Sequence, residues 1–360
     1  MKLPEPKKIN AQKYVAGLSL FKQKPIKIKL SANESALGPS PKAVREYNKI
    51  SKNFKRYPDS SGFFLRKTIG KKFKLDPNRI ILGSGSDQIL ELICKLFLKK
   101  NDEVIVSKYS FIIYRIYSKI NDAKIIYAKE ENYRTSVKNI LSSVTKKTKI
   151  IFLANPNNPT GTYVSKKNLL TLRKKLRSDI LLVIDDAYFE YVKKKDYASG
   201  MKIFSKSKNV IITRTFSKIY GLAGLRVGWG YSSKNIIYNL NKIKPPFNIN
   251  RPGLFAATAA IKDINWLKKE IYHVNKWRKI FFKEFKNMNI ETNEGDTNFL
   301  LVKFNRVKVQ SKKVFDLLAK AGILVRKMDL YGIENSLRIT IGNTNENKKL
   351  LIKMKKIFNV

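Results

Sequence analysis

Short runs of apolar, β-branched residues recur along the first two thirds of the chain, and each run ends in polar or glycine-rich residues. Between these runs lie stretches whose apolar positions are three and four residues apart, as in amphipathic helices. Strands that alternate with helices favour an α/β fold with a mostly parallel, doubly wound sheet. The predicted strands cover residues 79–82, 103–106, 124–127, 150–153, 180–184 and 210–213.

A further strand is predicted at residues 227–231, and its direction is expected to differ. About a dozen residues separate it from the strand that ends at Thr213, and they are rich in glycine. A connection between parallel strands needs a crossover, usually a helix, whereas an antiparallel return does not. We therefore expect this last strand to run antiparallel.

The last third of the chain has a different pattern, with a long helical stretch from Gly253 to about Phe285. It continues with strands at 299–304, 323–326 and 337–341, a helix at 309–321 and a terminal helix at 345–357. This pattern predicts a smaller α+β domain. The expected parts are an N-terminal arm (residues 1–41), a large α/β domain (42–248) and a small C-terminal α+β domain (249–360).

The single cysteine and the lengths of the apolar runs indicate in which cell compartment the protein is expected. No apolar run reaches the roughly 18 residues that span a bilayer, and the first residues lack the apolar core of a signal peptide. The single cysteine, Cys94, lies within an apolar pattern and excludes an internal disulfide or a cysteine metal site. A cytoplasmic protein without a membrane partner is expected.

The formal net charge of +47 would suit a protein that binds nucleic acid. However, the lysines are spread along the whole chain, in clusters no longer than Lys193-Lys194-Lys195, and no nucleic-acid-binding motif is present. We interpret the charge as a lysine-rich composition on solvated faces. Non-specific binding to polyanions at low salt is expected, but no specific nucleic-acid partner.

Candidate chemistry centres on Lys218, which follows the predicted strand at 210–213. Ser217 precedes it, Gly221 and Gly224 follow it, and Arg226 lies eight residues further on. A desolvated lysine at the end of a strand can lose its proton and attack a carbonyl. The serine hydroxyl and the guanidinium suit a phosphate. Pyridoxal phosphate fits both demands, although a surface lysine beside a glycine-rich turn remains the alternative.

Other polar motifs also follow predicted strands, at the sheet edge where ligands bind in open α/β folds. Gly85-Ser86-Asp87 opens a helix whose N-terminus can hold a phosphate. An aspartate such as Asp185 can keep a pyridine nitrogen protonated. Turn formation, helix capping and packing explain each motif singly, but less easily explain their order at successive strand ends. The remaining candidates are Tyr109 for ring stacking, and Asn158 and Tyr188 for a ring hydroxyl.

The combined set resembles the class I/II pyridoxal-phosphate-dependent aminotransferases. The matching motifs are Asn158-Pro159-Thr160-Gly161, Asp185 with Ala187-Tyr188, and Ser217-Lys218 with Gly224-Leu225-Arg226. Within that family the chain is most similar to the histidinol-phosphate aminotransferases, through Asn33-Glu34, Arg56-Tyr57-Pro58-Asp59, Gly85-Ser86-Asp87 and residues 337–342. The resemblance covers nearly the whole chain. It implies fold type I and a homodimer with the cofactor between the domains, the arm packing on the small domain and the partner.

The resemblance also implies a role for each site residue. Lys218 would hold the cofactor as a Schiff base and then move the proton between substrate and cofactor carbons. Arg338, with Arg326, Tyr14 and Asn33, would bind the substrate. The other cofactor-binding residues implied are Tyr57 (reaching the neighbouring subunit), Ser86, Asp87, Tyr109, Asn158, Asp185, Tyr188, Ser217 and Arg226.

Several functions remain open at this stage. The resemblance implies amino transfer from histidinol phosphate to 2-oxoglutarate in histidine biosynthesis. An aromatic amino-acid aminotransferase or a phospho-amino-acid decarboxylase on the same fold stays possible, because Lys108 and Lys327 depart from the family pattern near substrate-facing loops. A basic polyanion-binding protein is the alternative of a different class. The single histidine, His273, excludes a Ser-His-Asp triad and a histidine metal cluster.

Overall fold

The computed structural model describes residues 9–11, 20–21, 24–50, 52–53, 55–293 and 295–360, and every structural statement below refers to these. Tyr14, a predicted substrate contact, lies outside the described residues. Among the helices described, none combines the length and the apolar character needed to cross a membrane.

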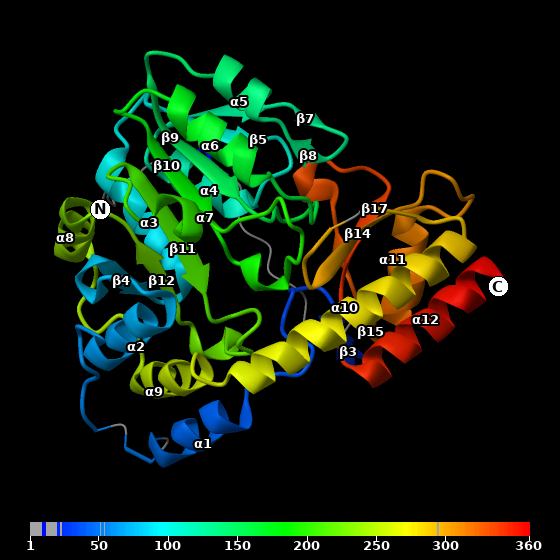
Figure 1. The fold of residues 1–360 in the computed structure, drawn as a ribbon. Helices are drawn as coiled ribbons and strands as arrows, with labels where there is room; N and C mark the ends of the chain where they lie inside the picture. The colour runs from blue at the N-terminus through cyan, green and yellow to red at the C-terminus, as the bar shows by residue number, and fades with distance from the viewer. Residues whose placement is uncertain (1–8, 12–19, 22–23, 51, 54, 294) are drawn as a thin grey trace, which may run out of the picture.

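A seven-stranded sheet forms the centre of the larger part of the molecule (Figure 1). The strand order is β4-β12-β11-β10-β9-β5-β6. β12 is antiparallel to both its neighbours, and the other pairs are parallel, so the predicted fold class and the antiparallel return are confirmed. The strands are β4 (Ile80–Gly83), β5 (Glu103–Ser107), β6 (Lys124–Ala128), β9 (Thr148–Ala154), β10 (Leu181–Asp185), β11 (Val210–Thr215) and β12 (Gly228–Tyr231).

Both faces of this sheet are covered by helices, because successive strand residues point to opposite sides. Phe152 and Val183 belong to the core shared with one helix layer, whereas Leu153 and Ile184 belong to the core shared with the other. The first layer contains α3 (Gly85–Phe97), α4 (Ile112–Ile120) and α8 (Lys234–Ile243). The second contains α2 (Phe63–Phe73), α6 (Lys166–Lys175) and α7 (Gly200–Phe204).

A second, four-stranded sheet lies in the C-terminal third, with strand order β13-β14-β17-β16. An N-terminal strand, β3 (Ile28–Lys29), pairs with β15 (Ile323–Leu324), so residues from the two ends of the chain lie side by side. The sheet strands are β13 (Glu291–Thr292), β14 (Phe299–Lys303), β16 (Arg326–Lys327) and β17 (Ser336–Thr340). The helices of this part are α10 (Ile264–Asn287), α11 (Ser311–Lys320) and α12 (Thr344–Phe358).

The long helix expected from Gly253 to Phe285 is two helices, α9 (Arg251–Ala260) and α10. Backbone turns in which Lys262 and Asp263 donate to Ala259 and Ala260 separate them. α9 packs on α1 (Pro41–Ile50) and α2, which belong to the larger part, while α10 extends toward the C-terminal sheet (Figure 1). The predicted domain boundary at 248/249 stays a prediction.

Several short elements lie outside the predicted pattern, because runs of two to six residues carry too little periodicity to be recognised. They include β1 (Leu20–Phe21), β2 (Lys24–Pro25), β7 (Glu130–Glu131), β8 (Arg134–Thr135) and α5 (Val137–Ser142). Single turns of 3-10 helix occur at η1 (Pro77–Arg79), η2 (Phe189–Tyr191), η3 (Ala223–Leu225) and η4 (Asp329–Tyr331).

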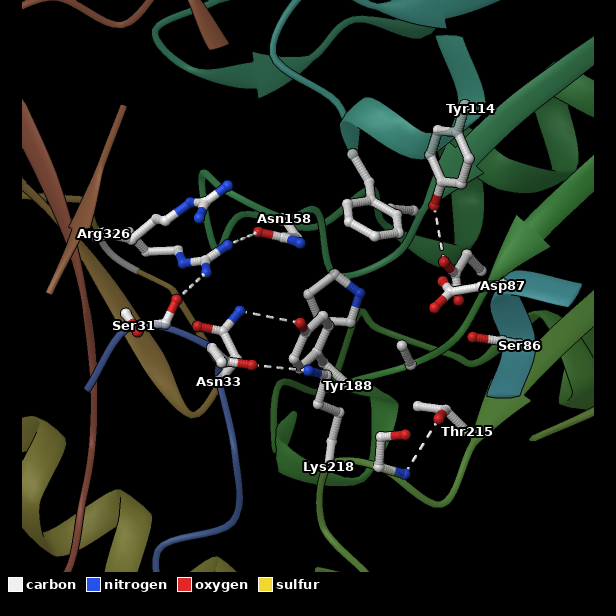
Figure 2. A pocket seen from close by; sticks show the side chains of 18 of the residues that line it. Ser31, Asn33, Ser86, Asp87, Tyr114, Asn158, Tyr188, Thr215, Lys218 and Arg326 are labelled. Carbon is white, nitrogen blue, oxygen red and sulfur yellow. Dashed lines mark hydrogen bonds between the residues drawn. The ribbon is translucent and has the colours of Figure 1, made fainter. Parts of the chain in front are cut away.

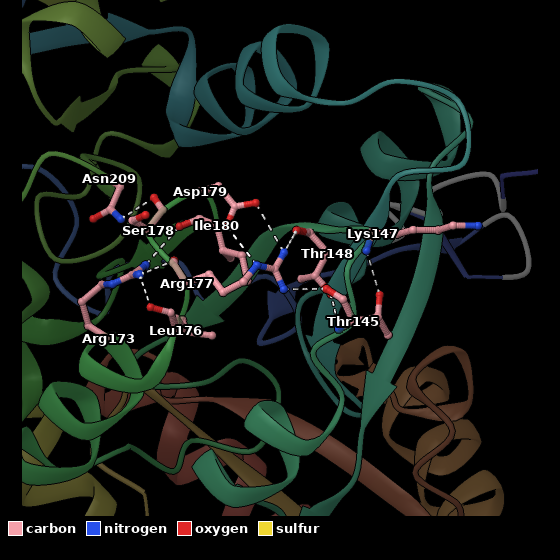
Figure 3. Close-up of polar contacts among 10 residues, drawn as sticks. All are labelled: Thr145, Lys147, Thr148, Arg173, Leu176, Arg177, Ser178, Asp179, Ile180 and Asn209. Carbon is pink, nitrogen blue, oxygen red and sulfur yellow. Dashed lines mark hydrogen bonds and ion pairs between the residues drawn. The ribbon is translucent and has the colours of Figure 1, made fainter.

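Two arginines, Arg173 and Arg177, form hydrogen bonds with the loops at the amino ends of β9 and β10 (Figure 3). Arg173 donates to the carbonyl oxygens of Leu176, Arg177 and Ile180. Arg177 donates to the carbonyl oxygen of Thr145 at 2.8 Å and pairs with Asp179 at 3.0 Å. These contacts supply donors to carbonyl groups at the end of α6 and in the loops that precede the two strands.

Candidate active site

A cavity lies at the carboxyl ends of the central strands, with the N-terminal segment and the C-terminal sheet forming its other walls (Figure 2). Most of the predicted site residues meet there although they are far apart in sequence. Those that line the cavity are Asn33, Ser86, Asp87, Asn158, Asp185, Tyr188, Ser217, Lys218, Arg226, Arg326 and Arg338.

Lys218 follows β11 and projects into this cavity. Its ammonium nitrogen donates to the carbonyl oxygen of Ala32 at 2.9 Å. Burial, and then the positive charge of Arg338, lower the pKa of Lys218 from 10.5 to about 8. A much larger share of the amine is therefore unprotonated at neutral pH than in an exposed lysine, and only the unprotonated amine attacks a carbonyl.

Asp185 ends β10 with a buried carboxylate that is only half satisfied. Its Oδ2 accepts a hydrogen bond from the hydroxyl of Tyr114 at 2.8 Å, whereas its Oδ1 has no hydrogen-bond partner among the described residues. Burial raises the pKa of Asp185 to about 6, and the hydrogen bond from Tyr114, with smaller contributions from Thr213 and the backbone of Ala187, opposes the rise. A buried carboxylate oxygen without a donor fits a ligand that brings a positively charged N–H group.

An anion-binding surface lies at the beginning of α3. Arg226, in a left-handed conformation with φ of 52°, donates to Ser217 Oγ at 3.2 Å and pairs with Asp87 at 3.3 Å. Gly85 has a φ of 77°, which residues with a Cβ rarely adopt, and a Cβ there would come within 2.3 Å of the Arg226 guanidinium and displace it. Backbone N–H groups at a helix N-terminus, two serines and a guanidinium are donors that a phosphate requires.

Hydrogen bonds join the polar groups on the opposite side of the cavity. The Tyr188 hydroxyl accepts from the Asn33 amide at 3.0 Å, and Arg338 donates to Asn158 Oδ1 and to the carbonyl of Ser31. Asn33 is also bonded to Thr340 through its backbone N–H and its side-chain oxygen. Much of its hydrogen-bonding capacity is thus used within the protein, and its predicted contact with substrate stays a prediction.

The two predicted substrate-binding arginines come from neighbouring strands. Arg326 in β16 and Arg338 in β17 are directly paired across the antiparallel ladder, and both line the cavity. Like charges at such positions repel one another. An anion between them relieves this repulsion, so this wall of the cavity suits a strongly charged ligand.

Two residues predicted to contact the cofactor do not line this cavity in the single chain, and their contacts stay predictions. Tyr109 does not line the cavity, because its ring packs against Tyr133 with centroids 5.5 Å apart, and Phe111 faces the cavity instead. Tyr57 is 80% exposed and stacks on Phe247, also outside this cavity. Ala187, part of a matching motif, also lines the cavity, and the lining residues that the sequence did not single out are Ser31, Ala32, Phe111, Tyr114, Ala154, Pro156, Thr215 and Tyr331.

The departures Lys108 and Lys327 are also placed by the structure. The Lys108 ammonium lies over the Tyr109 ring, 5.1 Å from its centroid, and that of Lys327 lies over the Phe315 ring at 4.3 Å. Neither residue lines the cavity. The residue pattern of the cavity is therefore unaffected by these two departures.

Comparison with known proteins shows to which family the chain belongs. The family model described as aminotransferase class I and II matches residues 25–353, which is most of the chain. The chain belongs to this aminotransferase family. Its members are the class to which the motifs at Lys218, Asp185 and Asn158 pointed, so the resemblance seen in the sequence is confirmed.

The similarity of this aminotransferase to its relatives covers nearly the full length of the chain. It is 48% identical to the histidinol-phosphate aminotransferase of Pelagibacter ubique (strain HTCC1062), over all of both chains. It is 40% identical to that of Paramagnetospirillum magneticum (strain ATCC 700264 / AMB-1), covering 98% of this chain and 97% of the relative. Among solved structures, the histidinol-phosphate aminotransferase of Sinorhizobium meliloti in complex with pyridoxal-5'-phosphate shares the fold, with a TM-score of 0.87 at 24% identity, covering 93% and 92% of the two chains.

Proposed function

We propose that this aminotransferase moves the amino group of histidinol phosphate to 2-oxoglutarate, with pyridoxal phosphate as its cofactor. The observation that carries the proposal is the 48% identity, over the entire chain, to a histidinol-phosphate aminotransferase. The cavity supports it, because it combines an amine of lowered pKa, a half-satisfied carboxylate and an anion-binding surface. Such an enzyme serves histidine biosynthesis.

The residues at the cavity fit the chemical groups of pyridoxal phosphate one by one. Lys218 would hold it covalently, and Asp185 would hold its ring nitrogen in the protonated state. Asn158 and Tyr188 would bind the ring oxygen. The phosphate would lie on the surface formed by Ser86, Asp87 (through backbone N–H groups), Ser217 and Arg226. When bound, the cofactor supplies a ring that accepts negative charge from the reacting substrate carbon.

Lys218 is the group we assign to proton movement. Its amine projects into the cavity and has a pKa of about 8, close to the pH at which a base works best. Released from the cofactor, it would take the proton from the substrate carbon and deliver it to the neighbouring cofactor carbon. Burial that favours the neutral amine therefore serves both its attack on a carbonyl and its action as a base.

Substrate choice is assigned to the two arginines paired on β16 and β17. Histidinol phosphate carries a phosphate ester and no carboxylate, whereas glutamate carries two carboxylates, so one site accepts different anions in turn. Arg338, held by Asn158 and Ser31, suits a group that every substrate carries in the same place. Arg326 adds the second positive charge that a phosphate ester needs. Tyr14 is proposed as a further contact on sequence resemblance alone.

Kinetics of Arg326→Ala and Arg338→Ala test this assignment. Removal of one partner of a charge-assisted contact costs about 1.5–3 kcal/mol, which is roughly a ten- to hundredfold loss of specificity. We expect Arg326→Ala to lower kcat/KM for histidinol phosphate by this amount and to affect phenylalanine and tyrosine much less. Arg338→Ala should lower kcat/KM for all three.

The alternatives give different results in the same assay. An unchanged ratio of kcat/KM values in Arg326→Ala would place phosphate recognition elsewhere and favour an aromatic amino-acid aminotransferase. Release of carbon dioxide from a phosphorylated amino acid, without 2-oxoglutarate, would indicate a decarboxylase. Arg306→Ala, which alters an arginine outside the cavity, is the matched control and should leave every ratio unchanged.

The proposal also covers the oligomeric state of the protein and its location in the cell. We infer a homodimer in the cytoplasm, in which Tyr57 of each subunit reaches the phosphate site of the other. An exposed apolar group supports the inference, since Tyr57, Phe63, Phe64, Phe247 and Phe255 are all exposed in the single chain. Exposed apolar patches commonly mark interaction surfaces. A groove lined by Tyr57, Phe64 and Phe255 runs over this region.

A further inference from the structure

Tyr114 lines the cavity, and aromatic side chains pack against its ring. It belongs to the first turn of α4, and its side chain is completely buried, at 0% exposure. Its ring stacks on Phe152 of β9, with centroids 4.9 Å apart and planes within 5° of parallel. The edge of the ring meets Phe111, which faces the cavity, at a centroid distance of 5.7 Å. The aromatic packing thus fixes where the Tyr114 hydroxyl points.

That hydroxyl points at Asp185 and donates a hydrogen bond to its carboxylate. The distance from the hydroxyl to Asp185 Oδ2 is 2.8 Å, as the dashed line in Figure 2 marks. Burial, and then the negative charge of Asp185, raise the pKa of Tyr114 well above its usual value. The phenol therefore keeps its proton throughout the neutral range, and the carboxylate is the acceptor.

The hydrogen bond from Tyr114 restricts the orientation of the Asp185 carboxylate. The last side-chain torsion of an aspartate is broad, so a carboxylate without contacts can turn both oxygens through a range of directions. A charge-assisted hydrogen bond to Oδ2 removes this freedom. It leaves Oδ1, which has no partner among the described residues, as the oxygen available to a ligand in the cavity.

We propose that Tyr114 is a positioning residue for the cofactor: by holding one oxygen of Asp185, it directs the other to the ring nitrogen of pyridoxal phosphate. The inference rests on the proposed function, because it requires that this cofactor enters the cavity. Tyr114 touches no reacting atom and acts through Asp185. Its own contribution should therefore appear only where a ligand has a ring nitrogen for Asp185 to bind.

Two ligands and the variant Tyr114→Phe test this directly. The variant removes the hydroxyl and keeps the ring that stacks on Phe152. Binding to the cofactor-free full-length protein would be measured for pyridoxal phosphate and for its analogue with C–H in place of the ring nitrogen. We expect Tyr114→Phe to weaken binding of pyridoxal phosphate roughly ten- to a hundredfold and to leave that of the analogue nearly unchanged.

The matched control is Tyr191→Phe, since Tyr191 is equally buried and donates to another carboxylate, Glu270, outside the cavity. It should leave the preference for pyridoxal phosphate over the analogue as in the unmodified protein. Tyr114→His, which retains a ring donor, should recover part of the preference and also provides a second variant if Tyr114→Phe does not fold.

The outcomes separate the positioning role from the proposed function. Equal losses for both ligands in Tyr114→Phe would reduce Tyr114 to a packing residue and overturn the inference. An unchanged affinity for pyridoxal phosphate would overturn it as well. If the unmodified protein binds neither ligand, the proposed function itself fails, and the inference fails with it.

Discussion

At the scale of single residues, the chemistry of the cavity depends on a few charges whose environment the fold changes. Lys218 is the clearest case. A sequence with 74 lysines and arginines gives no reason, by itself, to expect one lysine to be unprotonated. Burial of Lys218 next to Arg338 makes its neutral form more favourable, because both desolvation and a neighbouring positive charge oppose the ammonium ion.

The lowered pKa predicts how Lys218 reacts with pH. The rate at which Lys218 captures pyridoxal phosphate, trapped with borohydride and located by mass spectrometry, should rise with pH through a midpoint near 8. An ordinary lysine would show a midpoint near 10.5. Because a lower pKa enlarges the unprotonated fraction, capture at neutral pH should exceed that of an exposed lysine by roughly 300-fold in amine concentration alone.

A second variant checks the cause of this shift. Arg338→Ala removes a positive charge that disfavours the ammonium ion, so the midpoint for Lys218 should move toward higher pH. Arg306→Ala alters an arginine outside the cavity and should leave the midpoint in place. A midpoint above 10 in the unmodified protein would contradict the buried environment described for Lys218.

The sequence located some site residues because they stand close after predicted strands, and others only through the family resemblance. Lys218, Asp185 and Asn158 follow predicted strands, and the cavity brings them together, whereas Arg326 and Arg338 lie within strands and were implied by the resemblance. Tyr109 is predicted to stack on the cofactor ring, and this stays a prediction, but the residue that lines the cavity from the short connection before α4 is Phe111. Which of two nearby aromatic residues faces a cavity depends on the path of the connecting backbone, and a two-residue offset leaves no periodic signal.

At the scale of elements, strands with strong apolar runs were predicted to within one or two residues, whereas helix breaks were not. The expected helix from Gly253 to Phe285 has apolar positions throughout, yet it divides into α9 and α10. The division follows from packing, since α9 lies against α1 and α2, and α10 contributes to the core beneath the C-terminal sheet. No single glycine or proline marks this break between residues 260 and 264 in the sequence.

The amino edge of the central sheet offers a prediction about stability that is separate from catalysis. Arg173 donates to three backbone carbonyl oxygens around the start of β10, on the side of the sheet away from the cavity. Arg173→Ala would remove this donor from all three acceptors, of which the Arg177 carbonyl still accepts from the N–H of Ile180 at 3.4 Å. We expect the free energy of unfolding to fall by about 1–3 kcal/mol, with kcat/KM unchanged.

Urea unfolding gives the measurement, as a lower midpoint at the same slope. Lys174→Ala is the control, because Lys174 is the next residue of α6 and is exposed. A midpoint equal to that of the Lys174 variant would show that the carbonyl contacts contribute little. A large fall in kcat/KM would show instead that the amino edge is coupled to the cavity.

At the scale of the whole molecule, two surface properties stand beside the family assignment. The net charge of +47 is spread over the chain and belongs to its composition, since the cavity that the motifs predicted contains only a few of the cations. The exposed apolar group around Tyr57 is local, and it lies on α2, α9 and the connecting loops. A local apolar patch points to a specific contact, whereas a diffuse charge points to weak, salt-dependent association.

The proposed homodimer predicts that two inactive variants restore one another. Each site would combine Lys218 of one subunit with Tyr57 of the other, so a mixed dimer of Tyr57→Ala and Lys218→Ala contains one site with both residues intact. Random exchange makes half of the dimers mixed, each with one working site of two, so about a quarter of the unmodified rate should return. Transamination would be measured before and after subunit exchange.

The control mixes Lys218→Ala with Asp185→Ala. Both residues line the same cavity of one chain, so no site in the mixed dimer has both, and no activity should return. If the Tyr57 and Lys218 mixture also stays inactive after exchange is confirmed by mass spectrometry of the mixed dimer, Tyr57 does not serve the neighbouring site. Its ring, which stacks on Phe247 at 4.5 Å, would then contribute only to the surface on which it lies.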